Sequence, residues 1–372
     1  KKIMVGIRTT STILTVPIFT KGQSLLRDRD AFRTVVKMCV DRFRRNVRST
    51  QRLCMGLENI FGIVKMRDAA RHVENSDSRG GDEEYLRIEM QELSLSTTDQ
   101  QVLNRWGHSV CAINSNSSAL VFGGNCDDGR RHNDVVEVMM TTPSTLGVSN
   151  ITISSKQEPI NRAFQTFTSV RFNEYGVIPI LFGGRQSPQK SLNDMWALIP
   201  NSKNASWSWQ EISQDEKKVW PQARYRHACK DLGQGRLLIL GGRDTSQVFE
   251  DAWIVKLELV SSHSKVSVVS CTCVLKHNEL KRFSHTVVSE ESRIWISGGY
   301  NDLNGQHFCK NIVGIEIKDD SIVVADVKPS SVARASHVAA MIVGKKDMKK
   351  MILELGGCTE SHDETFGSTI NL

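Results

Sequence analysis

With 372 residues, 39% of them hydrophobic and 24% charged, the chain has the length and composition of a soluble globular protein that buries a substantial core. Its apolar runs are too short for a membrane-spanning helix, and its nine scattered cysteines without a Cys-x-x-Cys pair exclude a disulfide framework and a zinc ribbon. We therefore expect an intracellular, cytoplasmic protein with no membrane partner and no bound metal.

The net charge of +7 is concentrated at the front of the chain. Residues 1–67 contribute +11, residues 68–100 contribute −6, and the remaining residues contribute +2. Electrostatic attraction to nucleic acid is therefore expected to come from the first 67 residues. Because the chain begins with Lys1 rather than Met, we also expect part of the natural protein to precede it.

Residues 1–98 are predicted to form a small α/β segment. A β-rich start is followed, from Arg29 to Arg52, by apolar residues at helical spacing. The opposite face of this predicted helix carries four arginines, which are either a solvated surface or contacts to nucleic-acid phosphates: Arg42, Arg44, Arg45 and Arg48. An acidic stretch with an Asn, Ser and Gly cluster, typical of a loop, comes next.

The rest of the chain, residues 99–372, contains an internal repeat. An apolar run that ends in a glycine pair recurs at intervals of 60, 58, 57 and 58 residues, and the pairs are Gly123 and Gly124, Gly183 and Gly184, Gly241 and Gly242, Gly298 and Gly299, and Gly356 and Gly357. An Arg-x-x-His motif precedes four of the pairs, and the second copy has Gln165 in the histidine position. A phosphate-binding glycine loop would occur once and lead into a helix, so these glycines are predicted to be structural.

Each repeat reads as four short strands. The first follows Arg-x-x-His, the second is the apolar run, the third follows an acidic turn, and the fourth is a run such as Ser321 to Val327. The continuous apolar second strand implies burial on both faces. A four-stranded antiparallel sheet repeated about every 58 residues predicts a mainly β fold, a β-propeller of five or six blades.

The repeat resembles the kelch repeat, because Arg-x-x-His, the glycine pair and an Asp-x-Trp element recur in this order. The Asp-x-Trp copies begin at Asp194 and Asp251. The resemblance implies a kelch-type propeller whose last blade is completed by a strand from the other end of the domain, and Tyr85 to Leu93 is our candidate for that strand. We interpret the repeated Arg and His as groups that satisfy turns and inter-blade backbone, not as a catalytic or metal-binding set.

The end of the front segment carries a second resemblance. It is similar to the closing segment of leucine carboxyl methyltransferases, through Arg71, Val73, Glu74, Asp82, Glu83, Glu84 and Tyr85. This tail fused to kelch repeats resembles the layout of the tRNA wybutosine-synthesizing protein 4 (leucine carboxyl methyltransferase 2) family. The resemblance implies a transferase that uses S-adenosylmethionine to methylate and methoxycarbonylate the wybutosine side chain of phenylalanine tRNA.

The chain departs from that family in one respect. Residues 1–100 contain no glycine-rich loop between a strand and a helix, so the S-adenosylmethionine pocket is expected upstream of Lys1. We therefore assign no catalytic or cofactor-binding residue, and expect no cofactor to bind within this chain and no activity from the chain alone. Its propeller would serve as a support or as a platform for tRNA.

The alternative hypothesis is a non-catalytic kelch interaction module, such as a ubiquitin-ligase or cytoskeletal adaptor, whose propeller loops bind a protein. Residues 1–100 show no convincing BTB or F-box domain in front of the repeats, which favours the transferase.

Overall fold

The structure is a computed structural model that describes residues 2–4, 8–9, 12–13, 87–89, 96–114, 118–142, 145–172, 176–201, 206–213, 219–260, 265–290, 293–318, 320–330, 332–343, 350–359 and 367–371. The predicted arginine face, Arg42, Arg44, Arg45 and Arg48, lies outside these residues. Within the described part of the chain, no helix is long and apolar enough to cross a membrane.

Five antiparallel sheets, which we call blades 1 to 5, make up most of the described chain. The strands are, in blade 1, β5 (Ser109–Asn114), β6 (Ser118–Phe122), β7 (Val135–Thr142) and β8 (Thr145–Asn150); in blade 2, β9 (Thr166–Phe172), β10 (Gly176–Phe182), β11 (Met195–Asn201) and β12 (Ser206–Glu211); in blade 3, β13 (Ala228–Gly233), β14 (Arg236–Leu240), β15 (Asp251–Val260) and β16 (Lys265–Lys276); in blade 4, β17 (Thr286–Glu290), β18 (Arg293–Ser297), β19 (Asn311–Lys318) and β20 (Ser321–Pro329); and in blade 5, β22 (Val338–Val343), β23 (Lys350–Leu355) and β25 (Gly367–Asn371). The mainly β fold with repeated four-stranded sheets is confirmed.

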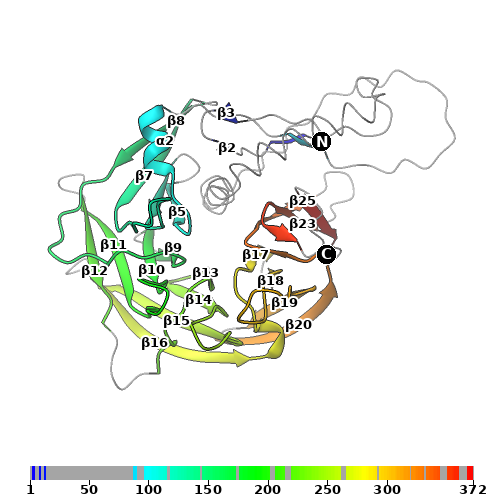
Figure 1. Ribbon diagram of the computed structural model, residues 1–372. Helices are drawn as coiled ribbons and strands as arrows, with labels where there is room; N and C mark the ends of the chain where they lie inside the picture. Colours follow the sequence, from blue (N-terminus) through cyan, green and yellow to red (C-terminus); the bar gives the residue numbers. More distant parts are fainter. Residues whose placement is uncertain are drawn as a thin grey trace, which may run out of the picture.

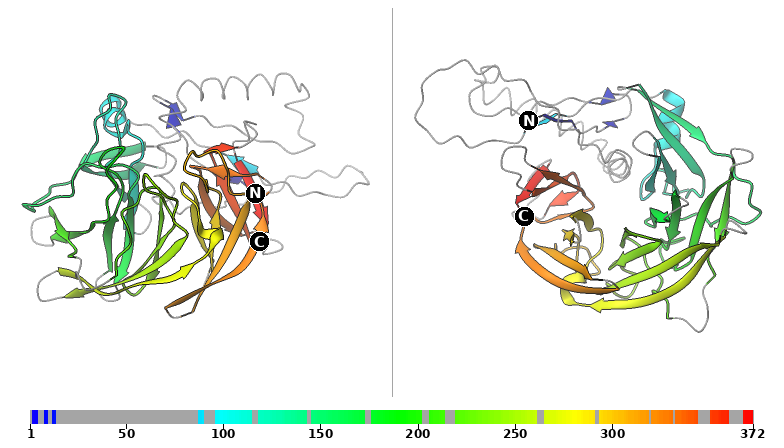
Figure 2. Two further views of the ribbon diagram at one scale, coloured as in Figure 1. Left: turned by 60° about the horizontal axis from the view of Figure 1, so that its bottom comes forward. Right: turned by 180° about the vertical axis from the view of Figure 1, so that it is seen from behind.

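The blades follow one another around a common centre (Figure 1). Successive strands are neighbours within blades 1 to 4, and the first strands of adjacent blades contact each other in the order β5, β9, β13, β17 and β22. These first strands lie on the inside of the ring and the fourth strands, such as β16 and β20, on the outside, as the view from behind also shows (Figure 2). This is the arrangement of a propeller.

The shorter elements lie mainly around the blades. Helix α2 (Thr97–Leu103), which the sequence did not predict, begins at the N-cap Ser96 and packs its last residue into the core of blade 1. The 3-10 turn η2 (Asn278–Leu280) precedes blade 4, and the small pair β21 (Arg334–Ala335) and β24 (Cys358–Thr359) belongs to the fifth repeat. At the front, β2 (Arg8–Thr9) pairs with β3 (Thr12–Ile13).

The prediction that Tyr85 to Leu93 completes the last blade is wrong for the residues that the structure describes. There, β4 (Arg87–Glu89) pairs in parallel with β1 (Lys2–Met4), and the described strands of blade 5 are three. In the described residues the backbone groups of β4 are thus paired with the other end of the front region, and not with a strand of blade 5.

The second strand of a blade is buried on both faces, as its apolar sequence predicted. In β14, Leu237 and Ile239 pack into a core shared with blade 2, whereas Leu238 and Leu240 pack into a core shared with blade 4. Because side chains alternate between the faces of a strand, β14 contributes to two inter-blade cores, as do β10 and β18. The register places Ile239 between Cys229 of β13 and Trp253 of β15.

The glycine pairs lie where neighbouring blades touch. Gly241 and Gly242 have φ values of 52° and 93°, and a Cβ atom on Gly241 would lie 2.5 Å from the carbonyl oxygen of Arg282 in the next repeat. The second glycine of each pair donates its N–H to the arginine carbonyl of the next repeat, at 2.9 Å (Gly124 to Arg162), 2.9 Å (Gly184 to Arg224), 2.8 Å (Gly242 to Arg282) and 2.7 Å (Gly299 to Arg334). Only glycine combines this backbone conformation with so close an approach.

The arginine of each repeat also binds within its own blade. Arg224, fully buried, donates to both carboxylate oxygens of Asp251 at 2.6 and 3.0 Å and to the carbonyl of Gly241 at 2.9 Å. Trp253 Nε1 donates to the same carboxylate at 2.8 Å, which explains the Asp-x-Trp element. Blades 1 and 2 repeat the bidentate pair, as Arg105–Asp134 and Arg162–Asp194. We call this arrangement the arginine clamp.

The last two repeats vary the acidic partner. Blade 4 has Asn311 at the corresponding turn, and Arg282 donates to the Asn311 carbonyl at 3.1 Å while Glu279 lies 3.5 Å away. In blade 5, Arg334 Nε lies 4.0 Å from the buried carboxylate of Glu354, and Arg334 donates to the Gly356 carbonyl at 2.7 Å. The contact of the arginine with the first glycine carbonyl is thus kept in every blade, even where the carboxylate comes from another position in the repeat.

The arginine clamp predicts unequal costs for two Arg→Gln substitutions. Arg224→Gln leaves the buried carboxylate of Asp251 without its cation, so we expect a loss of about 3–5 kcal/mol in unfolding free energy. Arg171, whose side chain is 70% exposed, pairs with Asp231 at 2.8 Å, and Arg171→Gln should cost no more than about 1 kcal/mol. Urea unfolding of the two variants measures the difference, and equal costs would contradict the role of the clamp.

Candidate functional site

The repeated histidines join neighbouring blades. His227 Nε2 lies 2.8 Å from the hydroxyl of Thr166 in blade 2, and His337 Nε2 lies 3.1 Å from the hydroxyl of Thr286 in blade 4. Gln165, which takes the histidine position in the second repeat, donates to the hydroxyl of Ser109 in blade 1 at 3.0 Å. The partner is in each case the residue after the His or Gln of the preceding repeat. These side chains therefore hold blades together rather than converge on a ligand.

His285 is the exception in this series. The residue at the corresponding place in blade 3 is Ala228, which has no hydroxyl, and both ring nitrogens of the buried His285 lack a hydrogen-bond partner. Burial, followed by the charge of Arg282 and by His337, lowers the pKa of His285 to about 3. Burial and Arg105 likewise lower the pKa of His108 to about 3. The described residues contain no group of three or more His, Cys, Asp and Glu side chains that could hold a metal ion.

The third residue of each Arg-x-x-His motif lies two residues before the first, innermost strand of its blade. These residues all have left-handed φ values, from 54° to 67°, and are Gly107, Phe164, Arg226, Ser284 and Ser336. Each donates its N–H to the carbonyl of the equivalent residue one blade earlier: Phe164 to Gly107 at 2.6 Å, then Arg226 to Phe164, Ser284 to Arg226 and Ser336 to Ser284 at 2.9 Å. Strained backbone in such a place is frequent at functional sites.

Arginines and aromatic rings gather next to these residues. We define the channel-mouth cluster as Arg131, Arg185, Arg226 and Arg243 together with the rings of Phe164, Tyr225 and Phe283. The guanidinium carbon of Arg226 lies 4.4 Å from the centre of the Phe164 ring, and that of Arg185 lies 4.9 Å from both Phe164 and Tyr225. Arg243 lies 5.0 Å from Phe283 and 5.5 Å from Tyr225.

The four arginines of the cluster have no carboxylate partner among the described residues, unlike the clamp arginines. Arg226 donates to the Ser284 hydroxyl at 3.3 Å, and Arg131 and Arg243 donate to loop carbonyls of the next blade. The buried Nε atoms of Arg131 and Arg185 have no hydrogen-bond partner. Burial lowers the pKa of Arg226, and the neighbouring charge of Arg185 adds to this effect. The cluster is thus a concentration of half-buried positive charge.

The cluster was not predicted, although the sequence contained a signal for it. Arg185 and Arg243 directly follow the glycine pairs of the second and third repeats, and Arg226 is the third residue of its Arg-x-x-His motif. Arg185 and Arg243 thus fall at the same point of their repeats, and Arg226 falls at another.

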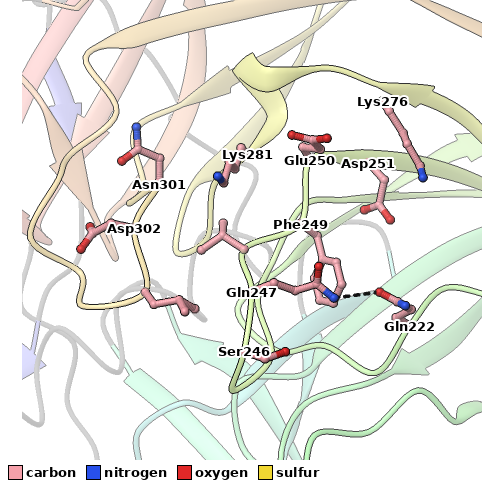
Figure 3. Close-up of a pocket in the computed structure, with 12 residues that line it drawn as sticks. Gln222, Ser246, Gln247, Phe249, Glu250, Asp251, Lys276, Lys281, Asn301 and Asp302 are labelled. Carbon is pink, nitrogen blue, oxygen red and sulfur yellow. Dashed lines mark hydrogen bonds between the residues drawn. The ribbon is translucent and has the colours of Figure 1, made fainter.

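A groove of ≈ 570 Å³ lies between blades 3 and 4 (Figure 3). Its lining combines Gln222, Ser246 and Gln247 from one side with Lys281, Asn301 and Asp302 from the other, and Gln247 donates to Gln222 at 3.1 Å. Asp251 belongs to the arginine clamp and also lines the groove. The polar lining, with both signs of charge, is suited to hydrogen bonding with a loop of another protein.

A thiol, an imidazole and a carboxylate lie in line in blade 1. Cys126 Sγ is 2.6 Å from His132 Nε2, and His132 Nδ1 is 3.3 Å from Asp134. This order resembles that of a nucleophile with its base. However, burial and the nearby Asp128 raise the pKa of the Cys126 thiol, and the carboxylate of Asp134 is already bound by Arg105. Both effects disfavour the thiolate that nucleophilic catalysis requires.

The missing hydroxyl beside His285 predicts a stabilising substitution. Ala228→Thr would supply the group that Thr166 and Thr286 supply elsewhere, so we expect a gain of about 0.5–1.5 kcal/mol in unfolding free energy. Ala228→Val is the control, because it adds the same volume without a hydroxyl and valine occupies this position in blade 5. A Thr variant no more stable than the Val variant in thermal unfolding would refute the hydrogen bond.

The buried histidines predict a loss of stability on mild acidification. The native pKa values of His108, His227 and His285 are lowered by burial, so below about pH 6.5 the unfolded state binds protons that the folded state excludes, and each of the three should cost about 1.4 kcal/mol per pH unit. Urea unfolding between pH 7 and 5 measures this slope. His285→Gln should flatten it, whereas substitution of the exposed His307 should not. A slope that His285→Gln leaves unchanged would contradict the assignment.

Comparison with known protein families agrees with the geometry of the blades. The model of the KLHDC2/KLHL20/DRC7 Kelch-repeats domain matches residues 174–357. An F-box/kelch-repeat protein of Arabidopsis thaliana is 28% identical over 162 residues, which are 42% of this chain and 32% of that protein.

Two further relatives carry the name of a tRNA modification. The tRNA wybutosine-synthesizing protein 4 of Saccharomyces cerevisiae is 34% identical over 97 residues, 26% of this chain and 12% of that protein. The tRNA wybutosine-synthesizing protein 2/3/4 of Arabidopsis thaliana is 31% identical over 157 residues, 42% of this chain and 14% of that protein. The chain thus spans less than a sixth of the length of these two relatives. It carries a kelch-repeat propeller domain and is homologous, over part of its length, to tRNA wybutosine-synthesizing protein 4.

Proposed function

We propose that the chain is the propeller part of a tRNA-modifying transferase of the tRNA wybutosine-synthesizing protein 4 type. The observation that carries this proposal is the similarity to two wybutosine-synthesizing proteins, at 34% and 31% identity, within a chain that has a kelch-repeat propeller. Such an enzyme would methylate and methoxycarbonylate the wybutosine side chain of phenylalanine tRNA. The propeller would act as a support or as a platform for the tRNA.

The division of labour follows from the residues of the propeller. S-adenosylmethionine would supply the transferred methyl group in the complete enzyme. The recurring glycine pairs are engaged with the next blade, since a Cβ atom on Gly123, Gly183, Gly241 or Gly298 would lie within 2.8 Å of an arginine carbonyl. They are therefore not available to cradle the cofactor. The residues of this chain are instead suited to bind and orient an anionic partner.

Charge supports tRNA as that partner. The chain carries a net charge of +7, with +11 on residues 1–67, and the channel-mouth cluster adds four arginines without a carboxylate partner in the described part of the propeller. Attraction to the phosphate backbone is the main source of affinity in nucleic-acid binding and also of its salt dependence.

A second candidate function is a non-catalytic interaction module that binds a protein on its loops. It is supported by the similarity to the F-box/kelch-repeat protein and by the polar groove between blades 3 and 4. Disruption of the gene separates the two functions. Loss of wybutosine from phenylalanine tRNA, measured by mass spectrometry of its nucleosides, is expected for the transferase, and unchanged wybutosine would contradict it.

The predicted arginine face provides a direct test of tRNA contact. Neutralising Arg44 and Arg45 to Gln should weaken binding of phenylalanine tRNA, because each phosphate contact adds roughly 0.9 to the slope of log affinity against log salt. Fluorescence anisotropy across a salt series measures the slope, which should fall by up to about 2. Neutralising the exposed Lys265 and Lys318 on the propeller is the control with the same charge change. An unchanged slope in the arginine variant would remove the proposed contact.

A further inference from the structure

The channel-mouth cluster combines cationic and aromatic side chains from neighbouring blades. Three guanidinium groups, those of Arg185, Arg226 and Arg243, share the rings of Phe164, Tyr225 and Phe283 as stacking surfaces. Cation–π stacking uses the flat faces of the guanidinium groups and leaves their N–H edges to acceptors. Arg243 already donates through Nε to the Asp244 carbonyl and through Nη1 to the Leu303 carbonyl, which leaves Nη2 for a ligand. The cluster therefore fixes the orientation of several donors before any ligand arrives.

The donors of the cluster are only partly used. Arg185 donates no side-chain hydrogen bond to any described residue, and its Nε is buried without a partner. Arg226 donates one side-chain hydrogen bond within the described residues, at 3.3 Å to a neutral hydroxyl. A buried donor without an acceptor costs free energy, and charged donors cost more than neutral ones. A protein retains such a cost in its free form where the binding of a ligand removes it.

The neighbouring positive charges act in the same direction. Arg185 and Arg243 both lower the pKa of Arg226, in addition to the larger effect of burial, and Arg185 does the same for Arg131. Each clamp arginine of blades 1 to 3, by contrast, faces a carboxylate at 2.6 Å. Within the described propeller, the arginines at the channel mouth are thus held close to one another, and no carboxylate neutralises them.

The backbone holds the cluster rigidly. Arg226 and Phe164 both have left-handed backbone conformations and are linked by the hydrogen bond from Arg226 N to Phe164 O, while Arg185 and Arg243 directly follow glycine pairs that are locked to the next blade. The charged groups therefore sit on the most constrained part of each repeat. Rigid placement reduces the entropy that is lost when a ligand binds.

We propose that the channel-mouth cluster binds a phosphate group of an unpaired RNA segment, with Arg185 and Arg243 as its main donors and the adjacent rings as surfaces for a base. This inference rests on the proposed function, because it names the place in the propeller that contacts the tRNA. Arginine binds phosphate through two parallel hydrogen bonds, and unpaired bases stack on aromatic side chains or on guanidinium planes. Duplex RNA would offer phosphates but no free base faces.

The test uses the 372-residue chain and a fluorescein-labelled RNA hairpin with the sequence of the anticodon stem and loop of phenylalanine tRNA. Arg185→Gln and Arg243→Gln should each weaken binding about tenfold in fluorescence anisotropy. Arg226 is left unchanged, because a substitution at its left-handed backbone position could disturb folding. Arg171→Gln, at an exposed arginine of β9 that lies outside the cluster and has the same charge loss, should change the dissociation constant less than twofold. Thermal unfolding checks that all variants are folded.

Competition identifies the ligand chemistry. An unlabelled single-stranded RNA of the loop sequence should displace the hairpin from the parent chain, whereas a perfect duplex of equal length should do so poorly. Effective competition by a glutamate-rich peptide of equal charge would overturn the assignment to RNA and indicate a protein ligand.

The results separate this inference from the proposed function. Hairpin binding that Arg185→Gln and Arg243→Gln leave unchanged would overturn the channel-mouth site alone, because tRNA binding itself would remain. Unchanged wybutosine after gene disruption, together with a loss of hairpin binding in the two variants, would overturn the proposed modification and leave the RNA site standing.

Discussion

The propeller depends on the buried arginine that opens each repeat. Its guanidinium group binds the first glycine carbonyl of its own blade, and in blades 1 to 3 also a carboxylate, while its main-chain carbonyl accepts the N–H of the second glycine of the blade before it. One residue thus joins strands within its own blade and also links this blade to the blade before it. Burying a cation costs free energy. The fold tolerates this cost because nearly all N–H donors of the guanidinium group are hydrogen-bonded.

The same repeat carries structural and binding roles at adjacent positions. Arg224 is buried and bound by its own blade, whereas Arg226, two residues later, lies next to Arg185 and Arg243 of the cluster. The left-handed backbone at Arg226 changes the direction of the chain between the two. A propeller can therefore keep its clamp constant and vary the third residue of the motif, which is Gly, Phe, Arg, Ser and Ser in successive blades.

The repeated parts of the fold were predictable from sequence, and the parts that occur once were not. The recurring glycine pairs predicted the blades, and apolar runs such as Leu237 to Leu240 predicted that the second strand is buried on both faces. Each copy of the repeat supports the prediction made from the others. Helix α2 and the pairing of β4 with β1 have no second copy to confirm them. The channel-mouth cluster escaped because its arginines come from different repeats, and one sequence does not show which positions face the same centre.

The absence of a hydroxyl at Ala228 has a mechanical consequence. The other seams between described blades carry a bond from a His or Gln side chain to a Ser or Thr, and the seam between blades 3 and 4 does not. The polar groove lies along the same seam, and blade 4 also lacks the bidentate carboxylate of its clamp. Among the four seams between described blades, the one between β13 and β17 should therefore be the first to separate on heating.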